Sequence, residues 1–232
     1  MNVMKIYFVR HGHPDYKNDS LTELGKKQAR AAAERLKDSG IERIYSSSCG
    51  RAFQTAEYTA KQFGLKVIPC DFIRELGWGS INGEPIYGNG QPWIVADSFV
   101  KGGKSVALKE WADSEAFHNN SLVGCVKTVT EGLDRWLASL GYEREGEYYR
   151  VTENVAYKTV AMFSHAGASS AAMAHLLNIP FPQFCEILDV YYTSVTVIDL
   201  FGEAGELISP KIRILNDSRH IDNIPIENVY GN

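Results

Sequence analysis

The sequence predicts an α/β protein, a three-layer αβα sandwich built around a mostly parallel sheet. Residues 5–9 form a continuous apolar run, Lys-Ile-Tyr-Phe-Val, which is rich in β-branched and aromatic residues. Such a run is typical of a strand that is buried on both faces. Strand-like and helix-like patterns then alternate along the first seventy residues, and this order favours right-handed crossovers between parallel strands.

Local signals define each element of this first part. A helix is expected after Thr22, a good N-cap, and Gly40 ends it. A second strand is expected over 41–46, and a second helix runs from about Arg51 to Gly64. A third short strand covers 66–69. The apolar residues that give the two helices their buried faces are Ala29, Ala32, Ala33, Leu36, Ala52, Ala56, Ala60 and Phe63.

The second part begins with a glycine-rich loop over 77–92. A long amphipathic helix follows and ends at Gly141; its apolar residues are Leu122, Val126, Val129, Leu133, Trp136 and Leu140. The remaining elements expected are a polar turn with a short strand over 142–151, a strand over 157–163, a helix over 168–177, and strands over 193–200 and 211–215. We expect one domain over residues 1–232, with a helical, cap-like insertion at about 80–150 over the active site.

Composition excludes several classes of partner. The 24 basic and 28 acidic residues give a net charge of −4, so we expect no general basic surface for nucleic acid or for an acidic membrane. No apolar segment approaches membrane-spanning length. The four cysteines lie far apart and form no CxxC pair, which favours reduced thiols over disulfides or a zinc site; they are Cys49, Cys70, Cys125 and Cys185. We therefore expect a soluble, cytoplasmic protein.

Cationic and nucleophilic side chains follow three of the expected strands. Arg10 and His11 come directly after the first strand, Arg51 opens the helix after the second, and His165 follows the strand over 157–163. Ligands of open α/β sheets bind beyond the carboxyl ends of the strands. Helix N-termini and arginine side chains both favour phosphate. The pattern therefore indicates a phosphate site at this edge of the sheet.

The chain resembles the histidine phosphatase superfamily, the phosphoglycerate-mutase-like family. The resemblance covers the first eighty residues and the stretch after 155, and its motifs come in the family's order and at its spacing. They are Arg10-His11-Gly12, Leu21-Thr22-Glu23-Leu24-Gly25 with Gln28-Ala29, Ser46 through Ala56, Arg74-Glu75-Leu76-Gly77-Trp78-Gly79, and Ser164-His165-Ala166-Gly167.

The resemblance implies a role for each site residue. His11 would attack phosphorus and carry a phosphohistidine, with its other ring nitrogen oriented by a nearby backbone carbonyl. Glu75 would protonate the leaving oxygen and then accept a proton from water. The resemblance implies no metal and no cofactor. The residues that would bind the phosphoryl group are Arg10, Arg51, His165, Gly12 and Ala166.

Other side chains remain candidates for parts of this chemistry. Asp71 and Glu84 are nearby carboxylates that could replace Glu75 as the acid. His13 lies two residues from the nucleophile and could contact substrate. Ser47 or Ser48 could form hydrogen bonds near the pocket. Three further histidines are expected to be solvated or structural, namely His118, His175 and His220.

Departures from the mutase pattern favour hydrolysis. The chain has Gly12-His13-Pro14-Asp15 where mutases place a serine or threonine followed by Trp-Asn, and residues 80–150 contain no arginine cluster for a second anionic group. We therefore expect a phosphatase acting on a phosphorylated small molecule, with a phosphoprotein substrate left open. A phosphoglycerate-mutase-type phosphotransferase and a non-catalytic phosphate- or phosphoprotein-binding module are the alternatives. The sequence leaves the oligomeric state open.

Overall fold

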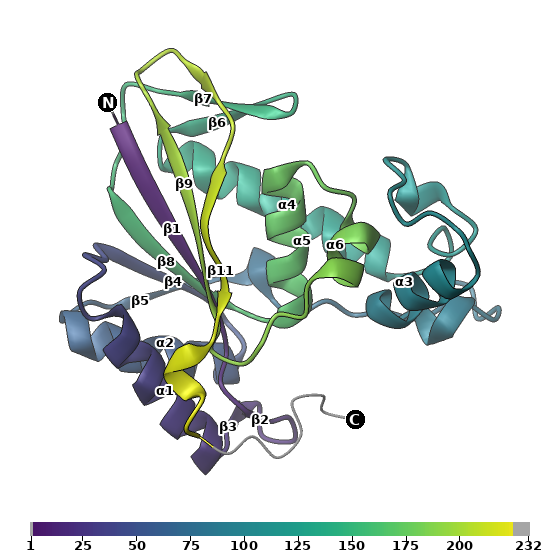
Figure 1. Cartoon of the computed structure of the whole chain (residues 1–232), viewed down its shortest axis with the longest axis horizontal. Coiled ribbons are helices and arrows are strands. Elements are labelled where there is room, and N and C mark those ends of the chain that lie inside the picture. Colours follow the sequence, from purple (N-terminus) through teal and green to yellow (C-terminus); the bar gives the residue numbers. More distant parts are fainter. Residues whose placement is uncertain (1, 225–232) are drawn as a thin grey trace.

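The computed structural model describes residues 2–224, and a six-stranded sheet forms its centre, in the order β11-β9-β1-β8-β4-β5 (Figure 1). The strands β1, β8, β4 and β5 are parallel, whereas β9 pairs antiparallel with both of its neighbours. The predicted mostly parallel sheet is therefore confirmed. The strands are β1 (Asn2–Arg10), β4 (Arg43–Ser47), β5 (Val67–Cys70), β8 (Thr159–Ser164), β9 (Val195–Gly202) and β11 (Lys211–Asp217).

Helices cover both faces of this sheet (Figure 1). On one face lie α1 (Glu23–Leu36) and α2 (Gly50–Phe63), and on the other α4 (Leu122–Ser139), α5 (Ala166–Leu177) and α6 (Phe181–Ile187). Side chains alternate between the two layers along each strand. Phe8 of β1 belongs to the core beneath α4 and α5, and the next residue, Val9, belongs to the core beneath α1 and α2. This arrangement is the predicted three-layer sandwich.

The ends of the helices follow from local chemistry. The Thr22 hydroxyl accepts a hydrogen bond from the N–H of Gly25 at 3.1 Å, which caps α1 as predicted. Gly64 ends α2 with φ +64°, a conformation that glycine adopts without steric cost. Asn178 ends α5 in the same left-handed region. The predicted start of α5 at 168 is corrected, because the helix begins at Ala166 with His165 as its N-cap.

Smaller strands form two additional sheets. The hairpin of β2 (Pro14–Asp15) and β3 (Ser20–Leu21) lies between β1 and α1 in the chain. The stretch predicted as a turn with a strand is a hairpin of β6 (Tyr142–Glu145) and β7 (Tyr148–Val151), to which β10 (Leu207–Ile208) adds a third strand.

The segment between β5 and α4 is largely irregular. It contains α3 (Pro92–Lys101), which packs against α6, and Figure 1 shows α3 to one side of the central sheet. Neither α3 nor α6 was predicted from the sequence. Short 3₁₀ turns complete this segment and the C-terminal region: η1 (Asp71–Ile73), η2 (Tyr87–Gly90), η3 (Trp111–Asp113) and η4 (Arg219–Ile221).

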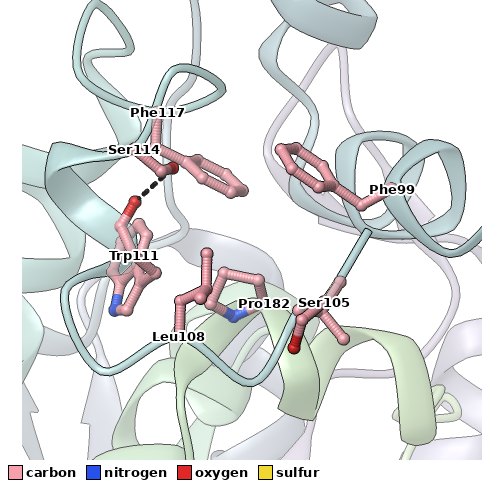
Figure 2. A pocket seen from close by; sticks show the side chains of 8 residues that line it. Phe99, Ser105, Leu108, Trp111, Ser114, Phe117 and Pro182 are labelled. Atoms are coloured by element: carbon pink, nitrogen blue, oxygen red, sulfur yellow. Dashed lines mark hydrogen bonds between the residues drawn. The ribbon is translucent and has the colours of Figure 1, made fainter. Parts of the chain in front are cut away.

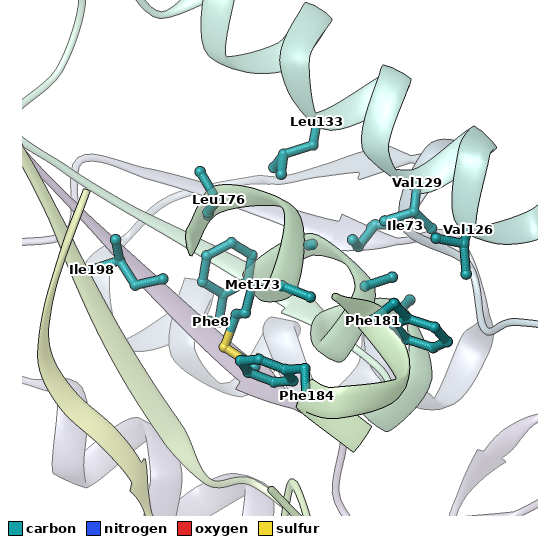
Figure 3. Packing of buried hydrophobic residues seen from close by; sticks show 14 of the residues in the cluster. Phe8, Ile73, Val126, Val129, Leu133, Met173, Leu176, Phe181, Phe184 and Ile198 are labelled. Atoms are coloured by element: carbon teal, nitrogen blue, oxygen red, sulfur yellow. The ribbon is translucent and has the colours of Figure 1, made fainter. Parts of the chain in front are cut away.

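The two ends of the 80–150 segment have different surroundings. Its last helix, α4, packs in the main core, where Figure 3 shows Val126, Val129 and Leu133 beside side chains of β1, α5 and α6. Its earlier part encloses a small apolar pocket next to Pro182 of α6 (Figure 2). The side chains that line this pocket with Pro182 are Phe99, Ser105, Val106, Leu108, Trp111, Ser114 and Phe117. The predicted capping role of this segment stays a prediction.

Within residues 2–224, no helix has both the length and the apolar character needed to cross a membrane.

Candidate active site

Three parallel strands deliver the predicted reactive residues to one edge of the sheet. Strand β1 leads into His11, and β8 leads into His165. These two strands are direct neighbours, and the N–H of His11 donates to the carbonyl oxygen of Ser164 at 2.9 Å. The ring centroids of the two histidines are 5.1 Å apart. Strand β4, on the other side of β8, leads into α2 and its second residue, Arg51.

The imidazole of His11 is buried and held in one orientation. Its Nδ1 lies 2.7 Å from the carbonyl oxygen of Gly12, so Nδ1 carries the ring proton and donates it. Nε2 therefore keeps its lone pair, which accepts a hydrogen bond from Nε of Arg51 at 3.4 Å. Burial and then the charges of His165 and Arg10 hold the pKa of His11 well below its usual 6.5. The ring is thus neutral at physiological pH.

Gly12 is the residue that allows this orientation. A Cβ at position 12 would lie 2.6 Å from the carbonyl oxygen of Gly25, at the start of α1. The N–H of Gly12 donates to the Thr55 hydroxyl at 3.1 Å, which ties the loop to α2. Close packing against two helices therefore fixes the peptide whose carbonyl oxygen orients His11.

The two arginines reach the site from different layers. Arg10 donates from Nη1 to the carbonyl oxygen of Val190 at 2.6 Å, and its guanidinium lies 3.9 Å from the centre of the Tyr192 ring. Its Nε is buried without a hydrogen-bond partner among the described residues. Arg51 is 9% exposed and forms an ion pair with Asp19. Both guanidiniums keep N–H groups available for an anion beside His11.

His165 is fully buried and offers a further donor. Its Nε2 lies 2.8 Å from the Ser47 hydroxyl, which in turn accepts from the N–H of Cys49. The hydroxyl proton is then available for Nε2, and we assign the ring proton to Nδ1 on this basis. Nδ1 is buried and has no partner among the described residues, so its N–H is available to bind an anion. Burial and the charge of Arg51 lower the pKa of His165 well below 6.5.

Glu75 is the carboxylate that the structure brings to the two histidines. Its Oε1 accepts from the N–H groups of Leu76 at 3.0 Å and Ala168 at 3.2 Å. A Cβ at Gly167 would lie 2.8 Å from Oε1, so this close approach requires the glycine of the Ser-His-Ala-Gly motif. Burial raises the pKa of Glu75 above its usual 4.5. A raised pKa suits a group that must donate a proton.

The two alternative carboxylates lie elsewhere. Asp71 is exposed and accepts a hydrogen bond from the Ser48 hydroxyl at 2.5 Å, and that hydroxyl also accepts from Arg74. Glu84 is exposed in the irregular segment after β5. Ser47 contacts the site through His165, whereas Ser48 belongs to this outer network.

The site could in principle hold a cation or an anion. Donor atoms of His11, Glu75 and His165 all lie within 4.8 Å of one another, a spacing that suits a metal ion. The guanidiniums of Arg10 and Arg51, however, flank the same space, and both repel a cation at short range. Fixed cationic donors around a neutral imidazole fit a tetrahedral oxyanion better than a divalent metal.

The remaining histidines lie outside this group. His13 contacts the N-cap of α1, because its Nδ1 lies 3.0 Å from the Thr22 hydroxyl, and its ring packs against Tyr192. His118 is exposed, His175 bonds Asp134 in the region between α4 and α5, and His220 lies 3.1 Å from the Thr193 hydroxyl. The placement of the last three agrees with their expected solvated or structural character.

Sequence reasoning missed two residues of the site. Tyr192 precedes β9, and its ring lies against Arg10, His11 and His13, with centroid distances of 5.8 Å to His11 and 5.5 Å to His13. Asp19, in the β2–β3 hairpin, binds Arg51. Neither residue belongs to a motif or a periodic pattern, so the sequence contained no signal for them.

Comparisons with known proteins agree with this geometry. Residues 6–93 match the family model described as the histidine phosphatase superfamily (branch 1). Over 93 residues the chain is 37% identical to proteins named probable phosphoglycerate mutase GpmB from Yersinia pestis and Yersinia pseudotuberculosis. That match covers 36% of this chain and 43% of each relative, so it spans less than half of their length.

Solved structures resemble nearly the whole chain. A mycobacterial glucosyl-3-phosphoglycerate phosphatase in complex with inorganic phosphate is 25% identical, with a TM-score of 0.63, and the match covers 94% of this chain and 100% of that one. A phosphoserine phosphatase variant from Entamoeba histolytica in complex with phosphoserine has a TM-score of 0.60 at 18% identity, covering 94% and 99%. This second likeness concerns the fold alone.

Proposed function

Because this chain belongs to the histidine phosphatase superfamily, we propose that it is a metal-independent phosphomonoester hydrolase with a phosphohistidine intermediate on His11. The observation that carries the proposal is the orientation of His11. Its Nδ1 is bonded to the Gly12 carbonyl oxygen, and its Nε2 is unprotonated beside Arg51. A nucleophile whose tautomer is fixed in this way needs no metal ion to activate it.

In the first step Nε2 of His11 attacks phosphorus, and the bond from phosphorus to the ester oxygen breaks. Glu75 donates its proton to the departing oxygen, so that the product leaves as an alcohol. Its raised pKa supports this role. General acid catalysis of this kind contributes about 10²–10⁴-fold.

In the second step water attacks the phosphohistidine. The Glu75 carboxylate accepts a proton from this water, the bond from phosphorus to Nε2 breaks, and inorganic phosphate leaves. His11 returns to its neutral form and Glu75 to its protonated form. One carboxyl group thus serves both steps, first as acid and then as base.

Fixed donors stabilise the charge on the transferring phosphoryl group. Phosphoryl transfer depends mainly on in-line positioning and on preorganised positive charge. Arg10 and Arg51 supply guanidinium N–H groups, and His165 supplies Nδ1–H. The unpartnered, buried nitrogens of Arg10 and His165 support this assignment. In the proposed site, the backbone at Gly12 and at Ala166, the first residue of α5, lies next to the phosphoryl oxygens.

We propose a small organic phosphomonoester as substrate. A structure named glucosyl-3-phosphoglycerate phosphatase is among those that this chain resembles, and its name supports this class. The segment over about residues 80–150 is proposed to set the preference for the leaving group. A phosphoprotein would be recognised by the same catalytic residues. A panel that contains both small phosphomonoesters and phosphoproteins separates these two substrate classes.

A mutase is the second candidate, and the relatives named probable phosphoglycerate mutase favour it. A mutase would pass the phosphoryl group back to a bound phosphoglycerate, so it would require a bisphosphorylated primer and release little inorganic phosphate. The same phosphohistidine on His11 would serve both reactions.

The test is release of inorganic phosphate from a panel of phosphomonoesters in the presence of EDTA. Wild type, His11→Ala and His118→Ala are compared, because His118 is an exposed histidine that controls for loss of an imidazole. We expect release by wild type and by His118→Ala, and none by His11→Ala. Interconversion of phosphoglycerates that depends on 2,3-bisphosphoglycerate, with little release, would favour the mutase. If wild type neither releases phosphate nor interconverts phosphoglycerates, the enzyme proposal is contradicted.

A further inference from the structure

The β2–β3 hairpin docks on the N-terminus of α2 through a single carboxylate. Asp19 Oδ2 accepts a hydrogen bond from the N–H of Gly50 at 2.7 Å. Its Oδ1 accepts from Nη1 of Arg51 at 2.5 Å. One side chain therefore binds both the first turn of the helix and the guanidinium that faces His11. A carboxylate at a helix N-terminus also interacts favourably with the helix dipole.

Local structure is adapted to this contact from both sides. Asp19 has φ +46°, a left-handed conformation that is uncommon outside glycine. A Cβ at Gly50 would lie 2.1 Å from the carbonyl oxygen of Asp19, so the hairpin reaches the helix only because residue 50 is glycine. The N–H of Leu21 donates to Gln54 Oε1 at 2.8 Å and holds the other end of the hairpin.

The contact restricts the long side chain of Arg51. Asp19 occupies Nη1 on one side of the guanidinium, and Nε lies 3.4 Å from Nε2 of His11 on another. The Tyr16 ring, from the same hairpin, lies with its centre 5.4 Å from the guanidinium carbon. An arginine free to sample its rotamers would lose that freedom each time it bound phosphate, and this loss would weaken binding.

We propose that Asp19 is a positioning residue, which orients Arg51 so that its remaining N–H groups meet the transferring phosphoryl group. This inference rests on the proposed function, because it assigns Arg51 to phosphoryl binding. It extends the active site to Asp19, although no residue between 14 and 20 was expected there from the sequence.

The charge state of Asp19 is consistent with this role. Burial raises the pKa of its carboxyl, but hydrogen bonds from Gly50 and Arg51 outweigh burial and leave the pKa below the usual 3.8. The carboxylate is therefore ionised at neutral pH, and it binds Arg51 through a charge-assisted hydrogen bond.

A double-mutant cycle between Asp19 and Arg51 tests the proposal. The variants are Asp19→Asn, Arg51→Ala and the pair, with kcat, KM and the affinity for inorganic phosphate measured for each. We expect Asp19→Asn to lower kcat/KM by about 10- to 100-fold, the range for loss of a charge-assisted hydrogen bond. In the Arg51→Ala background the same substitution should change kcat/KM and phosphate affinity by less than about 2-fold, because Asp19 acts through Arg51.

The matched control is Asp15→Asn in the same hairpin. Asp15 is half-buried and accepts hydrogen bonds from Lys17 and Asn18 rather than from Arg51, so its substitution removes the same charge without touching the guanidinium. We expect kcat/KM within about 2-fold of wild type. Asp19→Glu restores a carboxylate and should recover part of the loss.

An equal loss of kcat/KM from Asp19→Asn in wild type and in Arg51→Ala would overturn the proposal, since Asp19 would then stabilise the fold and not position Arg51. Wild-type activity of Asp19→Asn would overturn it as well. Failure of the proposed function looks different: wild type would release no phosphate from any ester, while the phosphate-binding cycle would still report the coupling. A wild type that binds no phosphate would contradict both.

Discussion

The ring of His11 and the carbonyl oxygen of Gly12 form a hydrogen bond of 2.7 Å between adjacent residues. The peptide that follows His11 thus fixes its tautomer, and no separate side chain is needed for this purpose. The same peptide is held by Thr55 and is pressed against Gly25. His11 is therefore positioned by backbone packing between β1, α1 and α2.

Activity should persist at acid pH. The pKa of His11 is held well below 6.5 by burial and by neighbouring cations, and only the neutral ring can attack phosphorus. The acid limb of kcat/KM should therefore lie well below pH 6.5. The measurement is kcat/KM for p-nitrophenyl phosphate as a function of pH, with the second ionisation of the substrate taken into account. An enzyme ionisation near 6.5 would contradict this description of His11.

Glu75→Gln should separate substrates by their leaving groups. An alkyl alkoxide needs a proton as it leaves, so the variant should lose about 10²–10⁴-fold on alkyl phosphates. Nitrophenolate leaves without a proton, and its first-turnover burst should survive in rapid-mixing experiments. Asp71→Asn is the control, because Asp71 binds Ser48 outside the site. Equal losses on both substrates, or a larger effect of Asp71→Asn, would remove Glu75 from the role of acid.

Gly12→Ala should damage both stability and turnover. Its Cβ would lie 2.6 Å from a backbone oxygen, and such overpacking costs about 1–3 kcal/mol. For a chain of this size the expected fall in Tm is about 2–12 °C. Gly124→Ala in α4 has open space around the new Cβ and serves as control. Differential scanning fluorimetry measures the Tm of the two variants. An unchanged Tm for Gly12→Ala would show that the loop relaxes freely.

The buried histidines should make the fold sensitive to acid. The folded-state pKa of His165 lies well below the 6.5 of an unfolded chain, so the unfolded state binds a proton that the folded state does not. Stability is therefore complete above pH 6.5 and falls as the pH drops toward the folded-state pKa. His165→Gln should reduce this slope by about 1.4 kcal/mol per pH unit. Urea unfolding of wild type and His165→Gln between pH 7 and pH 5 measures it, and equal slopes for the two proteins would contradict this expectation.

The position of the site could be predicted from the sequence because parallel strands end at a common edge. His11, Arg51 and His165 each follow such a strand or open the next helix, and the structure brings them together. The strand order could not be predicted, since β8 inserts between β1 and β4 through contacts distant in sequence.

Other features escaped prediction for local reasons. The seven residues of α6 are too few to show a helical period, and α3 begins at Pro92 directly after the glycine-rich loop. Asp19 and Tyr192 come from a tight hairpin and from the loop before β9, where conformation rather than residue pattern decides what a side chain meets.

If His11 carries the phosphoryl group during turnover, the phosphohistidine can be trapped and located in the chain. A phosphomonoester with a good leaving group is mixed rapidly with the enzyme, turnover is stopped with alkali, in which phosphohistidine survives, and the peptides are mapped by mass spectrometry. The account predicts one phosphoryl group on the peptide that contains His11, and none in His11→Ala. A burst of leaving group with the phosphoryl group on another residue, or turnover by His11→Ala, would contradict it.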